Sequence, residues 1–450
     1  MAKRLWDKGD ALDSVVHAFT VGNDPEIDRQ LVYWDALASA AHARMLAEVG
    51  LIGAADANAL LEQLAQIATL GKNGNFPIPR ELEDCHTAIE ARLTEQLGDP
   101  GRKINTGRSR NDQVLVAMRL LIRDNLCRGL EHLADFVGCT LKRAESVGHL
   151  PMPGYTHLQA AMPASTAMWL LAFAEHGLEV LQAGLALYQG LNCNPLGAAA
   201  GFGTPLPINR ELTARLLGFN RVQRNPINIQ NSRGRYELQY LRWVVDAASI
   251  SEKLAWDCEL FSTSEFGLLK LPVEFTTGSS IMPQKRNADV AELLRARTAR
   301  LRGLEDELRW VTSKLPSSYH RDYQYTKEPL IRAAAELDEL LPVAALLVER
   351  LQFNEEVLKT SLSPELVATY DAYRRVRAGV AFRQAYQQSA VALQAGEIEA
   401  GNYAQEFKAV TASIDQELVA AKAELDSILK LLQTLRTSTS NALERLFISI

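Results

Sequence analysis

The chain has 450 residues, of which 47% are hydrophobic and 23% are charged, and its formal net charge is −6. This composition is typical of a soluble globular protein, and a chain of this length is expected to fold into more than one domain. The acidic balance argues against generic nucleic-acid binding, which requires a basic face.

The N-terminal sequence and the cysteines indicate the cellular location of the protein and the state of its thiols. MAKRLWDKGDALD lacks the charged-then-apolar pattern of a signal peptide, and no apolar run approaches the roughly 18–20 residues of a membrane span. We therefore expect a cytoplasmic protein. The five cysteines include no CxxC pair, so reduced thiols are expected rather than disulfides or a zinc site. Cys85 stands beside His86, but no further metal ligand follows at a suitable spacing.

Helical periodicity dominates the chain from residue 29 onwards. Two Ala- and Leu-rich helices are predicted over residues 29–48 and 54–70, and Asp84 or Thr87 can cap a shorter one. Five long helices with apolar stripes are then predicted, and they span 112–147, 164–189, 236–265, 289–314 and 322–351. The first would be roughly 50 Å long at ~1.5 Å per residue. Smaller helices are expected after residue 354.

No stretch alternates with period two over a useful length, so the prediction is an all-α fold. We expect three helical domains, at 1–107, 108–354 and 355–450, with the five long helices forming the central bundle. Helices this long and this apolar on more than one face usually bury further area in an oligomer.

Four polar loops separate the long helices. They lie at 107–112, 154–159, 276–287 and 317–328, and they supply hydroxyls, amides, cations and one histidine, His157. Such a set suits a small ligand with several carboxylates. Loops at one end of an antiparallel bundle can meet, and more can meet if subunits contribute to each other's sites. Taken singly, each loop is more simply explained by helix capping and turn chemistry.

The loop before the fourth long helix, FTTGSSIMPQKRN (275–287), is the richest in donors. Beside a helix N-terminus it offers backbone N–H groups and the side chains of Ser279, Ser280, Lys285 and Asn287. It is either a carboxylate-binding loop or a solvated linker. In the first interpretation, a base removes a proton next to a substrate carboxylate, and preorganised donors worth roughly 2.7–4 kcal/mol each hold the extra charge.

The segment GSSIMPQKRN (278–287) resembles the shared loop of the fumarase/aspartase superfamily, whose members cleave C–N or C–O bonds with release of fumarate. Gln284 within it is typical of the argininosuccinate lyase branch, which includes the δ-crystallins. The chain has none of the GxxxxGK[ST], HExxH or GxSxG motifs of other chemistries. The other stretches that carry the resemblance are TGRSRNDQV (106–114), PGYTHLQ (153–159), STSEFG (262–267) and Tyr319, Gln324 and Lys327.

The resemblance implies anti elimination of argininosuccinate to arginine and fumarate through an aci-carboxylate carbanion, the last step of arginine biosynthesis. Ser279 would remove the Cβ proton. His157 would take part in the acid step, oriented by Glu292. Lys285 and Asn287 would stabilise the aci-carboxylate. The substrate-binding residues that the resemblance implies are Asp28, His86, Thr87, Ser109, Arg110, Asn111, Thr156, Gln159, Tyr319, Gln324 and Lys327.

The resemblance also implies a homotetramer with a central helical bundle, in which three subunits build each active site. Neither a cofactor nor a metal is expected. The loop around Ser279 is expected to be mobile and to order over substrate.

The chain departs from the family's pattern at positions that flank these motifs. The departures are Asn23-Asp24 without the usual Ser, Ala160 to Pro163 after THLQ, Ala198 to Ala200 after PLG, Gly234 within Ser-Arg-Gly-Arg, and Ala288 in place of Pro. They motivate a second hypothesis, elimination from a different N-substituted aspartate. A third hypothesis, an inactive crystallin-like homologue, conflicts with the intact Ser279, His157, Lys285 and Asn287.

Overall fold

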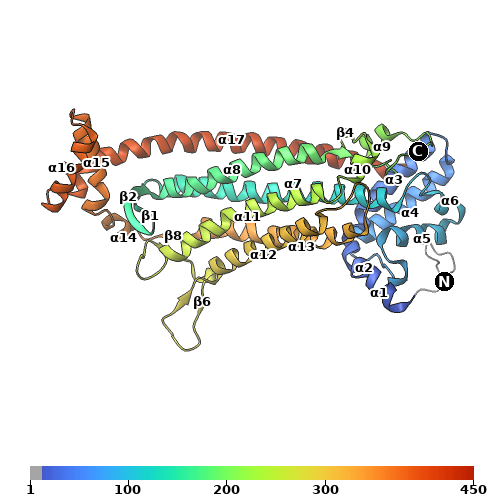
Figure 1. Ribbon diagram of the computed structural model, residues 1–450, viewed down its shortest axis with the longest axis horizontal. Coiled ribbons are helices and arrows are strands. Elements are labelled where there is room, and N and C mark those ends of the chain that lie inside the picture. The colour runs from blue at the N-terminus through green and yellow to red at the C-terminus, as the bar shows by residue number, and fades with distance from the viewer. Residues whose placement is uncertain (1–12) are drawn as a thin grey trace.

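The computed structural model describes residues 13–450. Long helices run side by side, and shorter helices gather at each end (Figure 1). The five predicted long helices are present as α7 (Arg110–Val147), α8 (Thr166–Leu191), α11 (Arg235–Phe261), α12 (Asp289–Thr312) and α13 (Lys327–Arg350). Consecutive helices run in opposite directions, so the loops between them alternate between the two ends of the bundle.

Helix α7 is the central element of the bundle. Ser109 caps it by accepting the backbone N–H of Asn111 at 3.0 Å. A glycine allows close helix packing: a Cβ on Gly129 would lie 2.8 Å from the Trp243 ring of α11. The indole of Trp243 is fixed in turn, because its Nε1 donates to the Val180 carbonyl at 3.0 Å. The apolar stripe of α7 is fully buried at Val116, Leu120, Leu126, Leu130, Leu133 and Val137.

The N-terminal helices form one end of the molecule (Figure 1). They are α1 (Ser14–Val21), α2 (Asp24–Ile27), α3 (Val32–Glu48), α4 (Ala54–Lys72), α5 (Cys85–Leu97) and α6 (Asp99–Lys103), with 3-10 turns at Asp28–Gln30 and Arg80–Leu82. The short helices α9 (Arg210–Leu216) and α10 (Pro226–Gln230) join them, as does the 3-10 turn η4 (Arg321–Thr326) between α12 and α13. This end therefore receives the loops before α7 and before α13.

The C-terminal part differs from the predicted run of smaller helices. Helices α14 (Glu355–Thr360), α15 (Pro364–Arg377) and α16 (Phe382–Gln394) are short, but α17 (Ala404–Glu444) has 41 residues. It packs along α7 and α8 and returns to the N-terminal end (Figure 1). No Gly or Pro interrupts its sequence, and its buried face repeats at helical spacing. The division into three domains stays a prediction.

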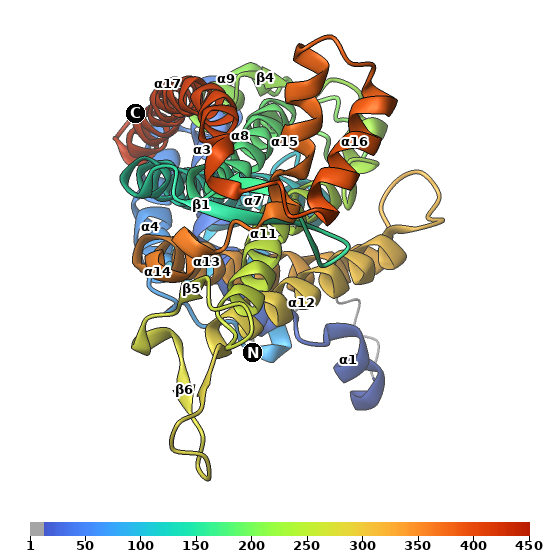
Figure 2. The ribbon, with the colours of Figure 1, turned by 90° about the vertical axis from the view of Figure 1, so that its left-hand side faces the viewer.

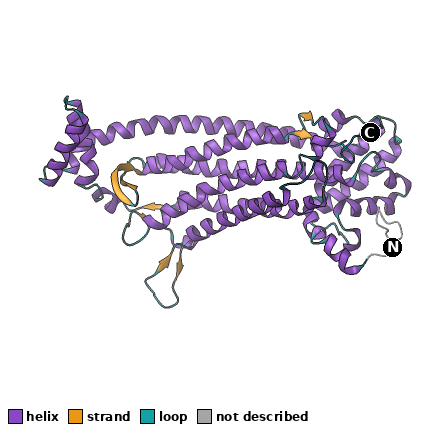
Figure 3. Ribbon diagram, viewed as in Figure 1, coloured by secondary structure: helices purple, strands orange, loops and turns teal. Residues whose placement is uncertain are grey.

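Short strands are the other difference from the all-α prediction (Figure 3). Strands β1 (Pro151–Thr156) and β2 (Gln159–Ser165) form an antiparallel hairpin in which Pro153 lies opposite Pro163. Prolines are tolerated there because a two-stranded hairpin leaves an open edge on each strand, and they hide the strand pattern in the sequence. Three two-residue pairs complete the set: β3 (Cys193–Asn194) with β4 (Arg221–Val222), β5 (Leu269–Lys270) with β8 (Gln352–Phe353), and β6 (Thr277–Gly278) with β7 (Arg286–Asn287).

Helix α8 is long and apolar enough, by composition alone, to cross a membrane, with a mean hydropathy of 1.2 over an 18-residue window. This differs from the expectation that no apolar run reaches the length of a membrane span. Half of the window is buried against the rest of the protein, and α8 packs on α7, α11 and α17. It is therefore a core helix of the bundle.

Candidate active site

The bundle separates the four polar loops into two pairs. The loops at 107–112 and 317–328 lie at the N-terminal end, whereas those at 154–159 and 276–287 lie at the opposite end (Figure 1). Helix α7 connects the two ends with 38 residues, which corresponds to about 57 Å. Within one chain, each polar loop therefore shares an end of the bundle with only one of the other three.

At the N-terminal end, Lys327 forms the centre of a buried ion-pair cluster. Its Nζ lies 2.6 Å from Asp28 Oδ1 and 2.8 Å from Asp24 Oδ1. Burial disfavours the charge on Lys327, but the two carboxylates outweigh it and raise the pKa of the amine above its usual value. Burial also raises the pKa of Asp24 to about 6, against the opposing effect of Lys327. The cluster carries two carboxylates for one ammonium group.

A second buried pair lies beside this cluster. Asp84 caps α5 by accepting the N–H of Thr87 at 2.8 Å, which fixes the first turn of the helix and with it His86. The Nδ1 atom of His86 lies 3.1 Å from Asp35 Oδ2 of α3. Burial alone would lower the pKa of His86, yet Asp35 raises it above its usual value. Burial would likewise raise the pKa of Asp35, but His86 lowers it, so the pair is stable as imidazolium and carboxylate.

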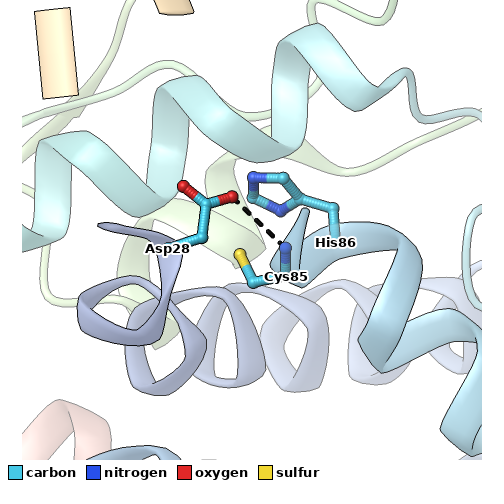
Figure 4. Close-up of side chains that lie close together, drawn as sticks. All are labelled: Asp28, Cys85 and His86. Carbon is cyan, nitrogen blue, oxygen red and sulfur yellow. Dashed lines mark hydrogen bonds between the residues drawn. The ribbon is translucent and has the colours of Figure 1, made fainter. Parts of the chain in front are cut away.

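Asp28, Cys85 and His86 lie close together at this end of the molecule (Figure 4). Their potential metal-ligand atoms lie within 4.8 Å of one another. Both oxygens of Asp28 are engaged, one by Lys327 and the other by the N–H of Cys85 at 3.2 Å. Burial raises the pKa of the Cys85 thiol well above its usual value, so the sulfur stays protonated. The geometry favours a buried hydrogen-bonded network over a metal centre.

A small cavity of about 40 Å³ opens between these groups. Six of the residues predicted to bind substrate line it: Asp28, His86, Arg110, Tyr319, Gln324 and Lys327. Thr87 joins them indirectly, because its hydroxyl accepts from Arg110 at 3.1 Å. Ser109 and Asn111 stand at the same end, but the hydroxyl of Ser109 is used as the cap of α7.

The cavity also contains charged groups that the sequence had not assigned to the site. These charged residues are Asp24, Glu83, Asp84, Arg233 and Arg321, and the apolar Val21 and Val114 complete the lining. The signal for Asp24 was its place one helical turn before Asp28. Arg233 lies in one of the departures from the family pattern, where it is buried, pairs with Glu237 at 3.3 Å and donates to the Tyr323 carbonyl at 3.0 Å. The next residue, Gly234, has a φ of 79°, and a Cβ there would lie 2.5 Å from Thr312.

The loop after Pro195-Leu196-Gly197 is a second segment that departs from the family pattern, and Asp112 holds its backbone in place. Its carboxylate accepts the N–H groups of Gly197 and Ala198 at 3.1 Å each. Ala198 is buried together with Leu115 and Ile229. Burial raises the pKa of Asp112 to about 6.

At the opposite end, His157 lies at the tip of the β1–β2 hairpin. His157 and Leu158 form the two-residue turn with φ values of 55° and 59°, the left-handed conformation of such hairpins. The side chains of Thr156, His157 and Gln159 are exposed. The hairpin therefore presents its polar groups to the outside of the chain.

The loop of Ser279 projects from the same end as a narrow hairpin (Figure 2). Pairing of β6 with β7 and a hydrogen bond from Thr277 to Asp289 close its base. The hydroxyl of Ser279 accepts the N–H groups of Ile281 and Met282 at 3.3 and 3.1 Å, a local turn contact. Ala288 stands at the N-cap position of α12, and neither Asn287 nor Asp289 caps the helix with its side chain.

The five residues expected to carry the chemistry all belong to this end: His157, Ser279, Lys285, Asn287 and Glu292. Lys285 and Glu292 are exposed, and Ser279 and Asn287 are half-buried. Within residues 13–450 no hydrogen bond or ion pair joins His157 to Glu292 or to Ser279. Their individual roles stay predictions.

Comparison with known proteins identifies a lyase family model and argininosuccinate lyases as similar to this chain. A protein-family model described as "Lyase" covers residues 10–303. The argininosuccinate lyase of Xylella fastidiosa (strain Temecula1) is 42% identical over 391 residues, 87% of this chain and 88% of that protein. The argininosuccinate lyase of Sorangium cellulosum is 43% identical over 91% of this chain and 94% of its own. That of Xanthomonas oryzae pv. oryzae (strain PXO99A) is 40% identical over 97% of this chain and its own full length.

Two solved structures share the fold. EDDS lyase in complex with formate superposes with a TM-score of 0.81 at 23% identity, over 97% of this chain and 95% of that one. A class II fumarase from Schistosoma mansoni superposes with a TM-score of 0.71 at 17% identity, over 86% and 93%. At these identities the likeness concerns the arrangement of helices.

Proposed function

The chain belongs to the lyase family that includes the argininosuccinate lyases, and we propose that it cleaves argininosuccinate into arginine and fumarate. The observation that carries this proposal is the 40–43% identity to argininosuccinate lyases over nearly the whole chain. The cavity at the N-terminal end supports it, because cations and carboxylates stand side by side there. Argininosuccinate carries carboxylates, an ammonium and a guanidinium group, and needs both kinds of partner.

In the proposed reaction Ser279 removes the Cβ proton of the succinyl part. Lys285 and Asn287, on the same loop, stabilise the charge that develops on the neighbouring carboxylate, where each good donor contributes roughly 2.7–4 kcal/mol. His157 takes part in protonating the leaving nitrogen, and Glu292 orients it. The substrate itself is held by the lining of the N-terminal cavity. No cofactor is required.

We propose further that three copies of the chain in a homotetramer build each active site. The binding cavity and the loop of Ser279 lie at opposite ends of a bundle of about 57 Å, so the loop must act on substrate bound by another copy. Exposed apolar side chains along the bundle offer a surface for association, among them Trp256, Leu293, Trp310 and Leu346. The proposed place of action is the cytoplasm, at the last step of arginine biosynthesis.

One assay tests the activity. Purified protein is given argininosuccinate, and fumarate is followed by its ultraviolet absorbance, with adenylosuccinate and aspartate as parallel substrates. The proposal predicts fumarate from argininosuccinate alone. Release of fumarate from adenylosuccinate or aspartate, and none from argininosuccinate, would contradict the proposal and favour elimination of a different amine, the hypothesis motivated by the departures from the family pattern.

A further inference from the structure

Asp35 is a buried carboxylate in an otherwise apolar part of helix α3. Its side chain is fully shielded from solvent, and the surrounding helix is rich in alanine. A carboxylate in such a place is unfavourable unless a cation compensates it. Among residues 13–450, the one side chain in ion-pair contact with Asp35 is His86, whose Nδ1 lies 3.1 Å from Oδ2. The pair connects α3 to the first turn of α5.

His86 has a second nitrogen, and its surroundings differ. Neither ring nitrogen meets hydrogen-bond geometry among residues 13–450, but Nδ1 has Asp35 as an ion-pair partner at 3.1 Å, whereas the buried Nε2 has no such partner. The ring lines the cavity that also holds Lys327 and Arg110, and only 2% of the residue is exposed. A buried N–H without an acceptor is unfavourable by about 1–3 kcal/mol, so such a group is usually matched by a bound acceptor.

We propose that Asp35 is a positioning residue: it holds His86 through Nδ1 so that the N–H at Nε2 donates to a carboxylate of the substrate in the cavity. The same arrangement is used by metal-binding and catalytic histidines, in which a carboxylate on one nitrogen fixes the orientation and protonation of the other. The inference rests on the proposed function, since argininosuccinate supplies the carboxylate.

The charges around His86 agree with this assignment. Burial lowers the pKa of His86, but the carboxylates of Asp35, Asp84 and Asp28 outweigh burial and raise it, which favours the form with a donor at both nitrogens. The neighbouring Cys85 thiol is neutral. The charged groups around the imidazole are Asp28, Asp35, Asp84, Arg108, Arg110 and Lys327.

A purely structural ion pair is the competing explanation. Arg108 lies near Asp35, but its guanidinium donates to Ser39 and Asn105 at 3.0 and 2.9 Å. A structural pair would change the stability of the protein and leave the affinity for substrate and its pH dependence as they are. A simple electrostatic role would lower KM on removal of Asp35, because an anion near an anionic substrate would be lost.

The test measures KM and kcat of the wild type, Asp35→Asn, His86→Gln and the double variant between pH 6 and 8.5. Removing Asp35 lowers the pKa of His86, so the protonated form is lost at a lower pH. The proposal predicts that Asp35→Asn raises KM at least tenfold at pH 8, much less at pH 6, and affects kcat less than KM. In the His86→Gln background, Asp35→Asn should change KM less than twofold.

Three results would overturn the proposal. They are a KM for Asp35→Asn that equals the wild-type value at every pH, a KM that falls, and independent multiplicative effects in the double variant. Asp371→Asn is the matched control, because Asp371 is a buried carboxylate paired with Arg375 in α15, far from the cavity. It should lower Tm without changing KM.

Calorimetric binding of fumarate and succinate keeps the inference testable if Asp35→Asn does not fold. Because Asp35 keeps His86 protonated, the wild type should bind either dianion with similar affinity at pH 6 and pH 8, and His86→Gln should bind both more weakly at both pH values. A wild-type affinity that falls between pH 6 and 8 as for an ordinary imidazole, or a His86→Gln affinity equal to that of the wild type, would contradict the proposal. These binding data do not depend on turnover, so a wild type that releases no fumarate would count against the proposed function alone.

Discussion

The two ends of the bundle use polar residues in different ways. At the N-terminal end, charges are buried and compensate one another: Lys327 is 4% exposed and contacts two aspartates. At the opposite end, Ser279 and His157 stand on short hairpins whose neighbours Ile281 and Leu158 are 80% and 69% exposed. The first end is preorganised within one chain. We propose that the second acquires its final geometry against another copy of the chain, which suits a loop that closes over substrate.

The largest expected effect concerns the exposed end. Ser279→Ala removes the proposed base, and kcat should fall by about 10²–10⁴-fold, the usual contribution of a positioned general base. Its hydroxyl makes only local turn contacts, so Tm and the oligomeric mass should stay at wild-type values. Fumarate release and calorimetry measure both quantities. A kcat within twofold of the wild type would exclude Ser279 as the base.

One substitution applied at both ends sharpens the contrast. Lys327→Gln leaves the buried Asp28 and the partly buried Asp24 without their cation, and the free energy of unfolding should fall by about 3–5 kcal/mol. Lys285→Gln, on the exposed loop, should leave stability unchanged and lower kcat. Chemical denaturation of the two variants gives the comparison. Equal stability losses would show that the two ends do not differ as described.

The pH dependence of stability should also come from the buried end. Burial raises the pKa of Asp112 to about 6 from 3.8, so the folded state binds the extra proton, and stability falls as pH rises from about 4 to 6. The effect is at most about 3 kcal/mol at 1.36 kcal/mol per pKa unit. Asp112→Asn removes this contribution. The Tm of the variant should rise relative to the wild type over this interval, and a constant Tm difference would contradict the assignment.

The smallest effect concerns the helices that separate the two ends. Gly129→Ala places a Cβ 2.8 Å from the Trp243 ring and should destabilise the protein by about 1–3 kcal/mol. Gly138→Ala, on the same helix, meets Leu425 at 3.6 Å, an ordinary contact. It should be neutral or stabilising by up to about 1 kcal/mol, because alanine favours the helix. If both variants behave alike in thermal unfolding, close packing at Gly129 is not what requires glycine.

Periodicity predicted the central bundle well, because each long helix carries an apolar stripe over many turns. It failed at the β1–β2 hairpin, where Pro153 and Pro163 conceal the strand pattern. It also underestimated α17, because the tail after residue 354 was predicted as smaller helices ending at 406–432, whereas α17 has 41 residues. The polar loops that carry the candidate site residues were recognisable in the sequence. Which end of the bundle each loop occupies depends on the direction of the helices. Local sequence does not encode that direction.

The buried partners of the site were harder to predict. Asp24 and Asp35 are single carboxylates in helical segments, and only the folded chain brings them to Lys327 and His86. A charged residue within an apolar helix was the available signal for Asp35, since burial without a partner is unfavourable. The sequence cannot say which cation, some fifty residues away, will provide compensation.

Complementation between inactive variants tests most directly whether one site uses opposite ends of different copies. Ser279→Ala and Lys327→Gln are each purified, then mixed, dissociated and reassembled, with mixed composition verified by mass. If different copies supply the two ends, random assembly should restore about a quarter of the sites, with wild-type KM. Reassembled mixtures that contain both chains but release no fumarate would contradict the shared site and the account of the two ends.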